Sequence, residues 1–182
     1  VVLIIKSIFF VKILFLVDQG DSPSSVYAYT SNSIIKKTKR FLITILDTLP
    51  TWLYLKKKKQ IFSTGFFGLS IRNTELFNWA GIIHIHWANH GFIDIKEIKK
   101  WNKPIIWTMR DMWPFTGGCH YSFNCDNYKL NCGACPVLGS DRKQDLSSLV
   151  LRQKIKYLSV LPIQWVAISN WMKTHASSST VL

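Results

Sequence analysis

The four cysteines of the chain are the residues whose spacing most directly suggests chemistry. They lie within 17 residues, spaced C-x5-C-x6-C-x2-C, at Cys119, Cys125, Cys132 and Cys135. A C-x2-C pair forms a turn that can present two thiolates to one ion, and four thiolates complete the tetrahedral shell of structural zinc. We therefore predict a structural zinc site. Two alternatives stay open: four reduced thiols packed in one loop, and two disulfides, which the lack of a recognisable secretion signal disfavours.

A second set of residues could carry acid-base or binding chemistry. Asp111 follows an apolar run and precedes two aromatic side chains, surroundings that can raise a carboxyl pKa and make the group an acid or base. Its alternative role is to accept hydrogen bonds from loop N–H groups. We expect His84 and His86 to face opposite sides of a strand, with His86 reaching a cleft; a core or solvated role is the alternative. Gly117 and Gly118 allow either close approach of a ligand or a turn.

The apolar pattern indicates the elements that must position these residues. Short apolar runs predict strands at 12–17, 81–87, 104–109 and 163–168. Apolar residues at intervals of three and four predict helices at 33–49, 93–101 and 145–158, the last capped by Asp145, and Ser169 is expected to cap another. Alternating strands and helices predict an α/β fold with a parallel sheet buried on both faces. Ligands bind beyond the carboxyl ends of such strands, which selects three groups of residues: His86 to Asn89, Arg110 with Asp111, and Ser169 with Asn170.

Length, composition and charge limit the classes of protein. With 182 residues the chain fits one domain, in which residues 110–140 form a long loop. A hydrophobic content of 48% excludes a disordered chain, and nine glycines and six prolines are too few for a collagen-like one. The net charge of +13 favours anionic partners: nucleic acid, acidic lipid head groups or phosphorylated small molecules.

The distribution of the charge suggests a membrane surface. Lysines and arginines come in blocks among large apolar side chains, at residues 36–40, 56–59 and 96–103. This pattern suits an anionic membrane, while solvated lysines on loops and helix faces are the alternative. The apolar residues 1–17 are broken by Lys6 and Lys12 and run into turn residues at 18–23, which fits neither a spanning helix nor a signal peptide. We expect peripheral contact, with a membrane-inserted segment as the alternative.

Residues 104–140 carry a highly specific motif. The run PIIWTMRDMWPFTGGCHYSFNCDNYKLNCGACPVLGS closely resembles a segment of bacterial glycosyltransferases of the large retaining nucleotide-sugar family called group 1 or family 4. The similar branch acts in exopolysaccharide and capsule synthesis. Residues 82–100 and 165–172 also look like that branch, so that the resemblance covers residues 80–176 well and 12–79 loosely.

The resemblance implies a GT-B architecture, in which two Rossmann-like domains face each other across a cleft. Residues 1–182 would be the acceptor-side, N-terminal domain, incomplete at both ends, with a Rossmann-like parallel sheet flanked by helices. A C-terminal domain outside the chain would bind most of the nucleotide-sugar donor. The implied reaction moves a sugar to a glycan acceptor, expected to be lipid-linked, in the cytoplasm at the inner face of the plasma membrane. The family needs no catalytic metal, and this chain alone is expected to be inactive, as a fragment or a truncated remnant.

The resemblance also implies roles for individual residues. Asp111 would handle a proton or orient the acceptor, and the substrate-binding residues would be His86, Asn89, Arg110, Trp113, Thr116, Gly117 and Gly118. The family has histidine where this chain has Arg110; because arginine stays cationic and cannot act as a base, we expect it to clamp a phosphate or carboxylate. The alternative function is a basic, zinc-stapled nucleic-acid-binding module, disfavoured because Lys129 is the one cation between Cys119 and Cys135. We therefore expect no nucleic acid partner.

Overall fold

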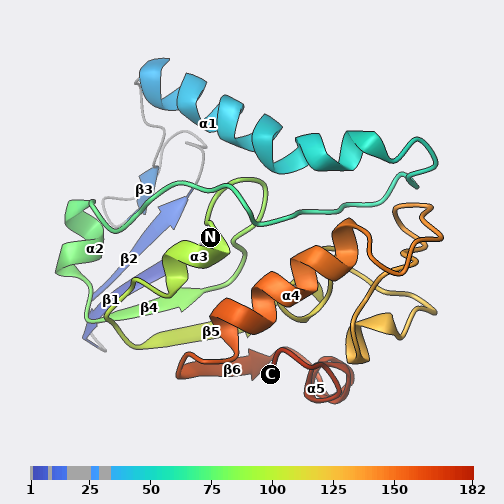
Figure 1. Cartoon of the computed structure of the whole chain (residues 1–182). Helices are drawn as coiled ribbons and strands as arrows, with labels where there is room; N and C mark the ends of the chain where they lie inside the picture. The colour runs from blue at the N-terminus through green and yellow to red at the C-terminus, as the bar shows by residue number, and fades with distance from the viewer. Residues whose placement is uncertain (1, 8–9, 16–25, 29–33) are drawn as a thin grey trace.

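A six-stranded sheet forms the centre of the molecule. The computed structural model describes residues 2–7, 10–15, 26–28 and 34–182, the first three ranges by their backbone alone. The strands lie in the order β3-β2-β1-β4-β5-β6 (Figure 1). They are β1 (Val2–Ser7), β2 (Phe10–Phe15), β3 (Val26–Ala28), β4 (Ile82–Ile85), β5 (Ile105–Met109) and β6 (Ile163–Ala167).

The direction of the strands confirms one part of the expected sheet and corrects another. β4, β5 and β6 are parallel, with Ile83 opposite Ile105 and Trp107 opposite Trp165. β2 and β3 are also parallel, but β1 runs antiparallel to both β2 and β4. The expectation of a parallel sheet is therefore wrong at β1, because the two residues between β1 and β2 are too few for the crossover that a parallel pair needs, and Ser7 lies opposite Phe10 in an antiparallel pair.

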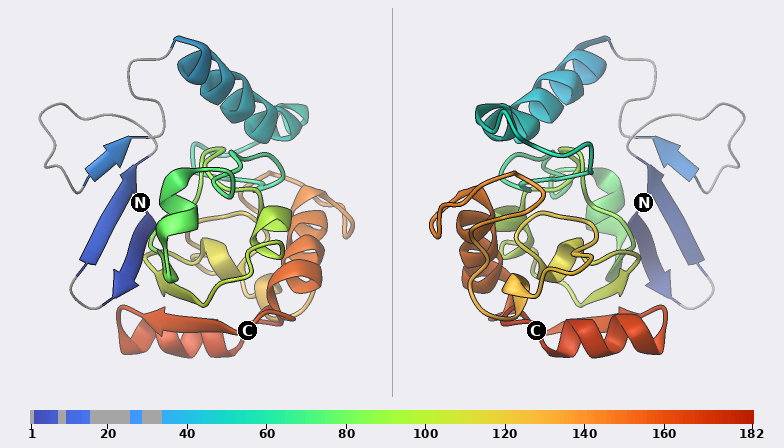
Figure 2. Two further views of the ribbon diagram at one scale, coloured as in Figure 1. Left: turned by 90° about the vertical axis from the view of Figure 1, so that its left-hand side faces the viewer. Right: turned by 90° about the vertical axis from the view of Figure 1, so that its right-hand side faces the viewer.

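Helices and short 3-10 turns connect and cover the strands. The helices are α1 (Ile34–Thr48), α2 (Glu75–Trp79), α3 (Ile95–Ile98), α4 (Leu146–Leu158) and α5 (Asn170–Ser177). The 3-10 turns are η1 (Leu49–Leu53), η2 (Trp113–Phe115) and η3 (Asn127–Lys129). α3 and α4 contact each other in front of β4 and β5, while α1 crosses above them, as Figures 1 and 2 show.

Side-chain caps fix where two of the helices begin. The Asp145 carboxylate accepts hydrogen bonds from the N–H groups of Ser147 and Ser148, and the Ser169 hydroxyl accepts one from Met172. These bonds satisfy N–H groups that have no partner within a first helical turn. Both predicted caps, Asp145 and Ser169, are confirmed, and they mark where α4 and α5 begin.

The core lies on one face of the parallel strands. Ile83, Ile85, Ile105, Trp107 and Ile163 are buried in it, and Trp107 stacks on Trp165 with ring centroids 5.2 Å apart. Their neighbours on the other face are less covered: in β6, Val166 keeps 39% of its surface exposed. The expectation of burial on both faces therefore holds for the central strand β5, where Thr108 and Met109 are both buried, and fails in β6, whose alternate side chains are exposed.

The remaining expectations about the chain have mixed outcomes. The strand predicted at 12–17 is confirmed over residues 12–15, which belong to β2, whereas residues 16–17 and the predicted turn at 18–23 lie outside the described residues. The loop at 110–140 has its own small core, in which Cys135, Val137 and Leu138 pack with Phe62. Among the residues that the structure describes, no helix is both long enough and apolar enough to cross a membrane.

Candidate functional site

Asp111 and His120 form a hydrogen-bonded pair beyond the carboxyl end of β5. The Asp111 Oδ2 atom lies 2.8 Å from His120 Nδ1, and it also accepts a hydrogen bond of 3.1 Å from Trp87 Nε1. Asp111 Oδ1 accepts from the backbone N–H of Trp113 at 2.9 Å. His120 reaches Asp111 because the turn at Gly117 and Gly118 returns the chain past the strand end, where the N–H of Met112 bonds to the His120 carbonyl.

The hydrogen-bond partners of His120 indicate which of its nitrogens carries the proton. A carboxylate beside Nδ1 favours a proton there, which leaves the Nε2 lone pair free to accept. His120 Nε2 lies 3.2 Å from the Ser63 hydroxyl and 3.5 Å from the Asn89 side-chain amide. The Asp111 carboxylate, the His120 imidazole and the Ser63 hydroxyl thus form a hydrogen-bonded row in space. This is the arrangement of a general base whose imidazole is oriented by a carboxylate.

The surroundings of Asp111 keep it ionised. Burial alone would raise its pKa, but the hydrogen bond and charge of His120, together with the Trp113 N–H and the Trp87 indole, outweigh burial and hold the pKa below its ordinary value. The expectation of a raised pKa is therefore wrong, because the neighbouring aromatic residues supply N–H donors as well as apolar surface. An ionised Asp111 is suited to orient His120 and to stabilise its cationic form.

A cavity of about 320 Å³ opens beside this pair. Trp87, Arg110, Asp111 and His120 line it, together with four residues of two other segments: Gln60, Ile61, Tyr121 and Phe123. Trp87, Tyr121 and Phe123 are 37%, 49% and 71% exposed, so their rings are accessible to a ligand. The cavity combines aromatic surfaces, one permanent cation and a proton acceptor, which is the set of groups that binds polar, hydroxyl-bearing molecules.

The other residues selected from the sequence lie at or behind this cavity. Arg110 lines it, as expected for a clamp on an anionic group. Asn89 is 3% exposed and stands behind His120. Trp113 is 1% exposed, and its indole N–H donates to the Ser63 carbonyl at 2.8 Å. Trp113 therefore holds the backbone of Ser63 in place behind His120.

Thr116, Gly117 and Gly118 form a closely packed turn between β5 and His120. Thr116 is fully buried. A Cβ on Gly117 would stand 2.4 Å from the Ser147 carbonyl oxygen, and one on Gly118, whose φ is +118°, would stand 2.6 Å from the Phe62 ring. The two glycines therefore let protein segments pack closely, and their role in binding substrate stays a prediction.

His86 lies beside His84, away from the Asp111–His120 pair. The two imidazole rings have centroids 4.2 Å apart, and His84 Nε2 lies 2.8 Å from the Thr108 hydroxyl. The expectation that His84 and His86 face opposite sides is therefore wrong, since residues two apart along a strand share a face. Burial, with the charges of His84 and Arg110, lowers the pKa of His86 to about 4, which keeps the ring neutral.

A buried lysine supports the site from α4, and the sequence pattern did not single it out. Lys154 is fully buried, and its Nζ donates to the carbonyl oxygens of Trp113 and, at 2.9 Å, of Thr116. It also stands 3.9 Å above the Trp113 ring. Burial lowers the pKa of Lys154 to about 7, while the nearby Cys119, Cys132 and Asp111 act in the opposite direction. Lys154 thus ties α4 to the turn that carries His120.

The four cysteines are free thiols that line one narrow space of about 20 Å³. Cys132, Gly133 and Ala134 all have positive φ values, of 52°, 96° and 44°, and the Gly133 N–H donates to the Ser147 hydroxyl at 2.9 Å. Within the described part of the chain, no three His, Cys, Asp or Glu side chains are grouped as ligands of a metal ion. A turn that brings the thiols to one space is thus present, and the zinc ion stays a prediction.

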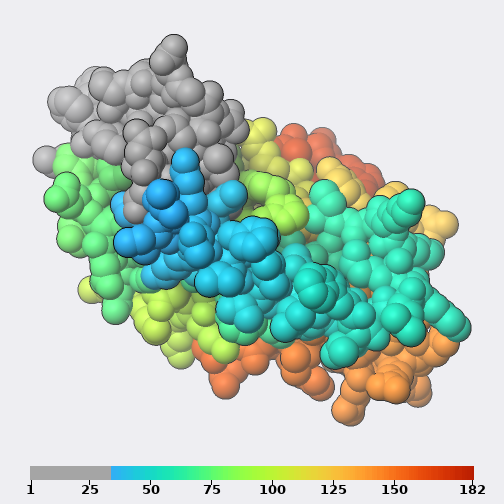
Figure 3. All heavy atoms as spheres, turned by 90° about the horizontal axis from the view of Figure 1, so that it is seen from above, coloured from blue at the N-terminus to red at the C-terminus, as the bar shows by residue number. Residues whose placement is uncertain are grey.

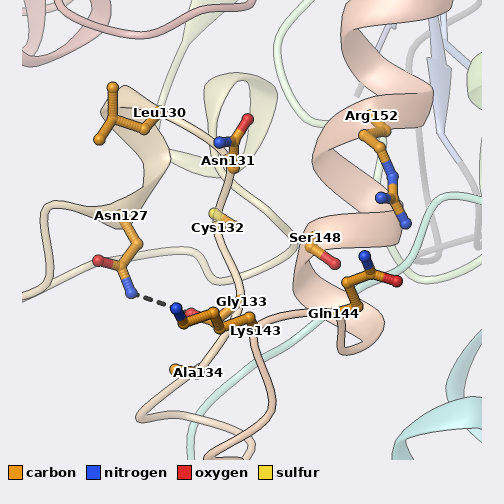
Figure 4. A pocket seen from close by; sticks show the side chains of 10 residues that line it. All are labelled: Asn127, Leu130, Asn131, Cys132, Gly133, Ala134, Lys143, Gln144, Ser148 and Arg152. Atoms are coloured by element: carbon orange, nitrogen blue, oxygen red, sulfur yellow. Dashed lines mark hydrogen bonds between the residues drawn. The ribbon is translucent and has the colours of Figure 1, made fainter.

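Two further cavities lack the acid-base pair. One, of about 550 Å³, lies between η3, the Cys132 turn and α4, and Figure 4 shows the side chains of Lys143 and Arg152 beside it. Its other lining side chains include no carboxylate and no histidine. The second, of about 660 Å³, lies between β6 and α5, with Lys173 as its charged residue. Both can contact anions, but neither presents a proton acceptor of the Asp111–His120 kind.

Comparison with known proteins gives one relationship. No protein-family model and no solved structure matches the chain. A segment of 63 residues, 32% of this chain, is 32% identical to the Escherichia coli (strain K12) protein WcaC, provisionally named a colanic acid biosynthesis glycosyl transferase. The match spans 16% of the length of WcaC. Over that segment the chain is related to a glycosyltransferase, and its α/β fold with parallel strands flanked by helices is compatible with a Rossmann-like domain.

Proposed function

We propose that the chain is the acceptor-side part of a GT-B glycosyltransferase of family 4, which moves a sugar from a nucleotide-sugar donor to a lipid-linked glycan. One structural observation carries the proposal: the Asp111–His120 pair lines an aromatic cavity beyond the carboxyl end of β5. Support comes from the relationship to a glycosyltransferase and from the rule that open α/β sheets bind ligands at this edge.

In this proposal the cavity holds the acceptor by three kinds of contact. The rings of Trp87, Tyr121 and Phe123 pack against the apolar C–H faces of a sugar. Arg110 pairs with a phosphate of the lipid-linked acceptor, for which its planar guanidinium offers two parallel donors. The acceptor hydroxyl donates a hydrogen bond to His120 Nε2, where it replaces the Ser63 hydroxyl.

The chemical step then follows from the position of His120. The acceptor oxygen forms a bond to the anomeric carbon of the donor sugar on the face from which the diphosphate oxygen departs, so that the carbon keeps its configuration while its bond to that oxygen breaks. The hydroxyl proton passes to His120 Nε2, and the nucleoside diphosphate leaves with the electron pair. Asp111, held ionised by its three donors, stabilises the resulting imidazolium. No step needs a catalytic metal ion bound by this chain.

A binding titration tests the proposal. A short-chain polyprenyl diphosphate disaccharide should quench the fluorescence of Trp87 and bind more tightly than the free disaccharide, because Arg110 adds a phosphate contact. Tyr121→Ala should weaken binding about tenfold, which is the usual cost of one stacked ring. Trp171→Phe, at an exposed site on α5, is the matched control and should leave the affinity unchanged. Absence of binding, or an equal loss in both variants, would contradict the proposed acceptor site.

A further inference from the structure

The outward face of α1 and η1 is apolar, the reverse of a normal surface helix. Nine large apolar side chains of α1, η1 and the residues just after η1 are 41% to 98% exposed: Ile34, Ile35, Phe41, Leu42, Leu46, Leu49, Trp52, Leu53 and Leu55. We call these nine residues the apolar ridge. Figure 3 shows that α1 and the segment after it occupy much of one face of the molecule. So many exposed large apolar side chains on one segment mark a binding surface.

Contacts on the opposite face of α1 hold the ridge outward. The Thr44 hydroxyl lies 3.2 Å from the His90 carbonyl, and Ile43 packs against the main core. The buried Asp47 carboxylate accepts hydrogen bonds from the Thr64 hydroxyl and, at 3.2 Å, from the Phe66 N–H. Because these contacts are specific, α1 could turn its ridge inward only by breaking the hydrogen bonds of Asp47 and Thr44 and by removing Ile43 from the core.

The charges around the ridge are of one sign. Residues 34–60 contain eight lysines and arginines, in two groups at the ends of the ridge: Lys36, Lys37, Lys39, Arg40, Lys56, Lys57, Lys58 and Lys59. The one acidic residue of this stretch, Asp47, is 1% exposed and faces the core. A partner that binds the apolar ridge is therefore expected to carry negative charge, which would complement the lysines and arginines at its ends.

We infer that the apolar ridge docks the protein on the surface of an anionic lipid bilayer. An interfacial helix buries its apolar side chains at the level of the acyl chains while flanking lysines contact phosphate head groups. Trp52 suits that boundary, because an indole has an apolar body and a polar N–H. A protein partner is less well matched, since lysine is depleted at the centre of protein interfaces. The helix lies along the surface and does not cross the bilayer.

Docking in this way would bring the cavity close to the lipid. Gln60 and Ile61, which line the cavity, follow directly after the basic residues 56–59. A lipid-linked acceptor could thus reach Arg110 without leaving the membrane surface. This consequence rests on the proposed function, whereas the docking itself depends on α1 and η1 alone.

Vesicle co-sedimentation of the chain tests the inference. The protein should bind phosphatidylcholine vesicles containing about 30% phosphatidylglycerol at least about tenfold more tightly than pure phosphatidylcholine vesicles. Trp52→Glu with Leu53→Glu should abolish binding, because both side chains are largely exposed and their replacement leaves the core intact. The matched control is Leu130→Glu, at a 70% exposed position on the loop at 110–140, and it should bind as the parent does.

A second comparison separates local docking from overall charge. Lys57→Gln, Lys58→Gln and Lys59→Gln together should weaken binding at least about tenfold, whereas Lys96→Gln, Lys99→Gln and Lys100→Gln, with the same change in charge, should not. Equal losses in the two triple variants, equal binding to neutral vesicles, or a Trp52–Leu53 variant that still binds would each overturn the inference. So would a concentration-dependent dimer in sedimentation velocity that this variant abolishes, because the ridge would then bind a second copy. Failure of the sugar titration alone would leave the docking intact.

Discussion

At the scale of single residues, the chemistry of the cavity depends on which nitrogen of His120 carries the proton. The 2.8 Å contact with Asp111 favours the proton on Nδ1. Asp111→Asn should remove this preference, since an amide can present either its oxygen or its NH2 group to the imidazole. It should also lower the free energy of unfolding by about 1–3 kcal/mol, because a buried charged acceptor of three hydrogen bonds is lost. Long-range ¹H–¹⁵N spectra would show the tautomers, and urea unfolding the stability.

Asp126→Asn is the matched control for this substitution. Asp126 pairs with Lys129 at 2.9 Å, but both side chains are well exposed, and exposed ion pairs contribute little to stability. We expect its unfolding free energy to stay within about 0.5 kcal/mol of the parent. If Asp111→Asn behaved in the same way and kept a single His120 tautomer, the orienting role of Asp111 would be wrong.

The sequence led to Asp111 but not to its partner. Asp111 could be found because a strand pattern predicts where β5 ends, and polar groups at that point are candidates for function. His120 lies nine residues later, and only the turn at Gly117 and Gly118 brings it back to the strand end. Ser63 lies far from His120 in the sequence, and the backbone β-bridge between Phe62 and Cys119 places it beside the imidazole. Contacts of this kind depend on tertiary packing, which local periodicity does not encode.

At the scale of elements, Lys154 couples the stability of α4 to pH. Its folded pKa of about 7 lies below the unfolded value of about 10.4, so between these values the unfolded chain binds one more proton. The free energy of unfolding should therefore rise from about pH 7 to about pH 8, by at most about 1.4 kcal/mol per pH unit. Above that range the ionisation of unfolded cysteines acts in the opposite direction.

Lys154→Met isolates this effect. Methionine cannot titrate, so the rise in stability between about pH 7 and about pH 8 should disappear in urea unfolding under reducing conditions. The variant also leaves the Trp113 and Thr116 carbonyl oxygens without their buried donor, which is expected to cost about 1–3 kcal/mol at the upper end of the range. An equal slope in the parent and in Lys154→Met would show that other groups cause the pH dependence.

The turn of the cysteine loop depends on Gly133. A Cβ at this position would stand 2.0 Å from the Lys143 carbonyl oxygen, and the φ of 96° is unfavourable for any L side chain. Gly133→Ala should therefore lower the free energy of unfolding by about 2 kcal/mol or more, as measured by urea denaturation. Gly81→Ala, at an exposed position without a positive φ, is the control and should change it little. A small effect at Gly133 would mean that the turn is easily displaced.

The accuracy of the predicted elements follows the length and regularity of their patterns. α1 and α4 were predicted because they are long, regular in their apolar spacing and, at Asp145, capped. α2 has five residues, too few to show a helical period, although the Thr74 side chain caps its start. The direction of β1 could not be read from its own residues, because an apolar strand pairs in either direction and its neighbours decide.

At the scale of the whole molecule, the loop at 110–140 joins parts that are otherwise separate. The backbone of Cys119 pairs with that of Phe62 in an isolated antiparallel β-bridge beside the cavity. The N–H of Cys135 donates to the Asp145 carboxylate at the start of α4. His120 follows Cys119 directly, so the position of the cysteine loop and that of the Asp111–His120 pair are connected through one peptide bond. An ion held by the four thiols would thus stabilise the cavity as well as the loop.

This connection makes the predicted zinc ion testable through two properties. Protein purified under reducing conditions should contain about one zinc ion per chain, because four thiolates form a closed tetrahedral shell. The buried Lys154, close to Cys119 and Cys132, offsets part of the negative charge of such a shell. Removing the metal with a chelator should lower the melting temperature and weaken binding of the acceptor analogue at the cavity, whereas Cys132→Ser with Cys135→Ser should abolish both zinc and its effects. A zinc ratio near zero in folded protein would instead establish the reduced thiols as a packing cluster, with His120 held by Asp111 and the glycine turn alone.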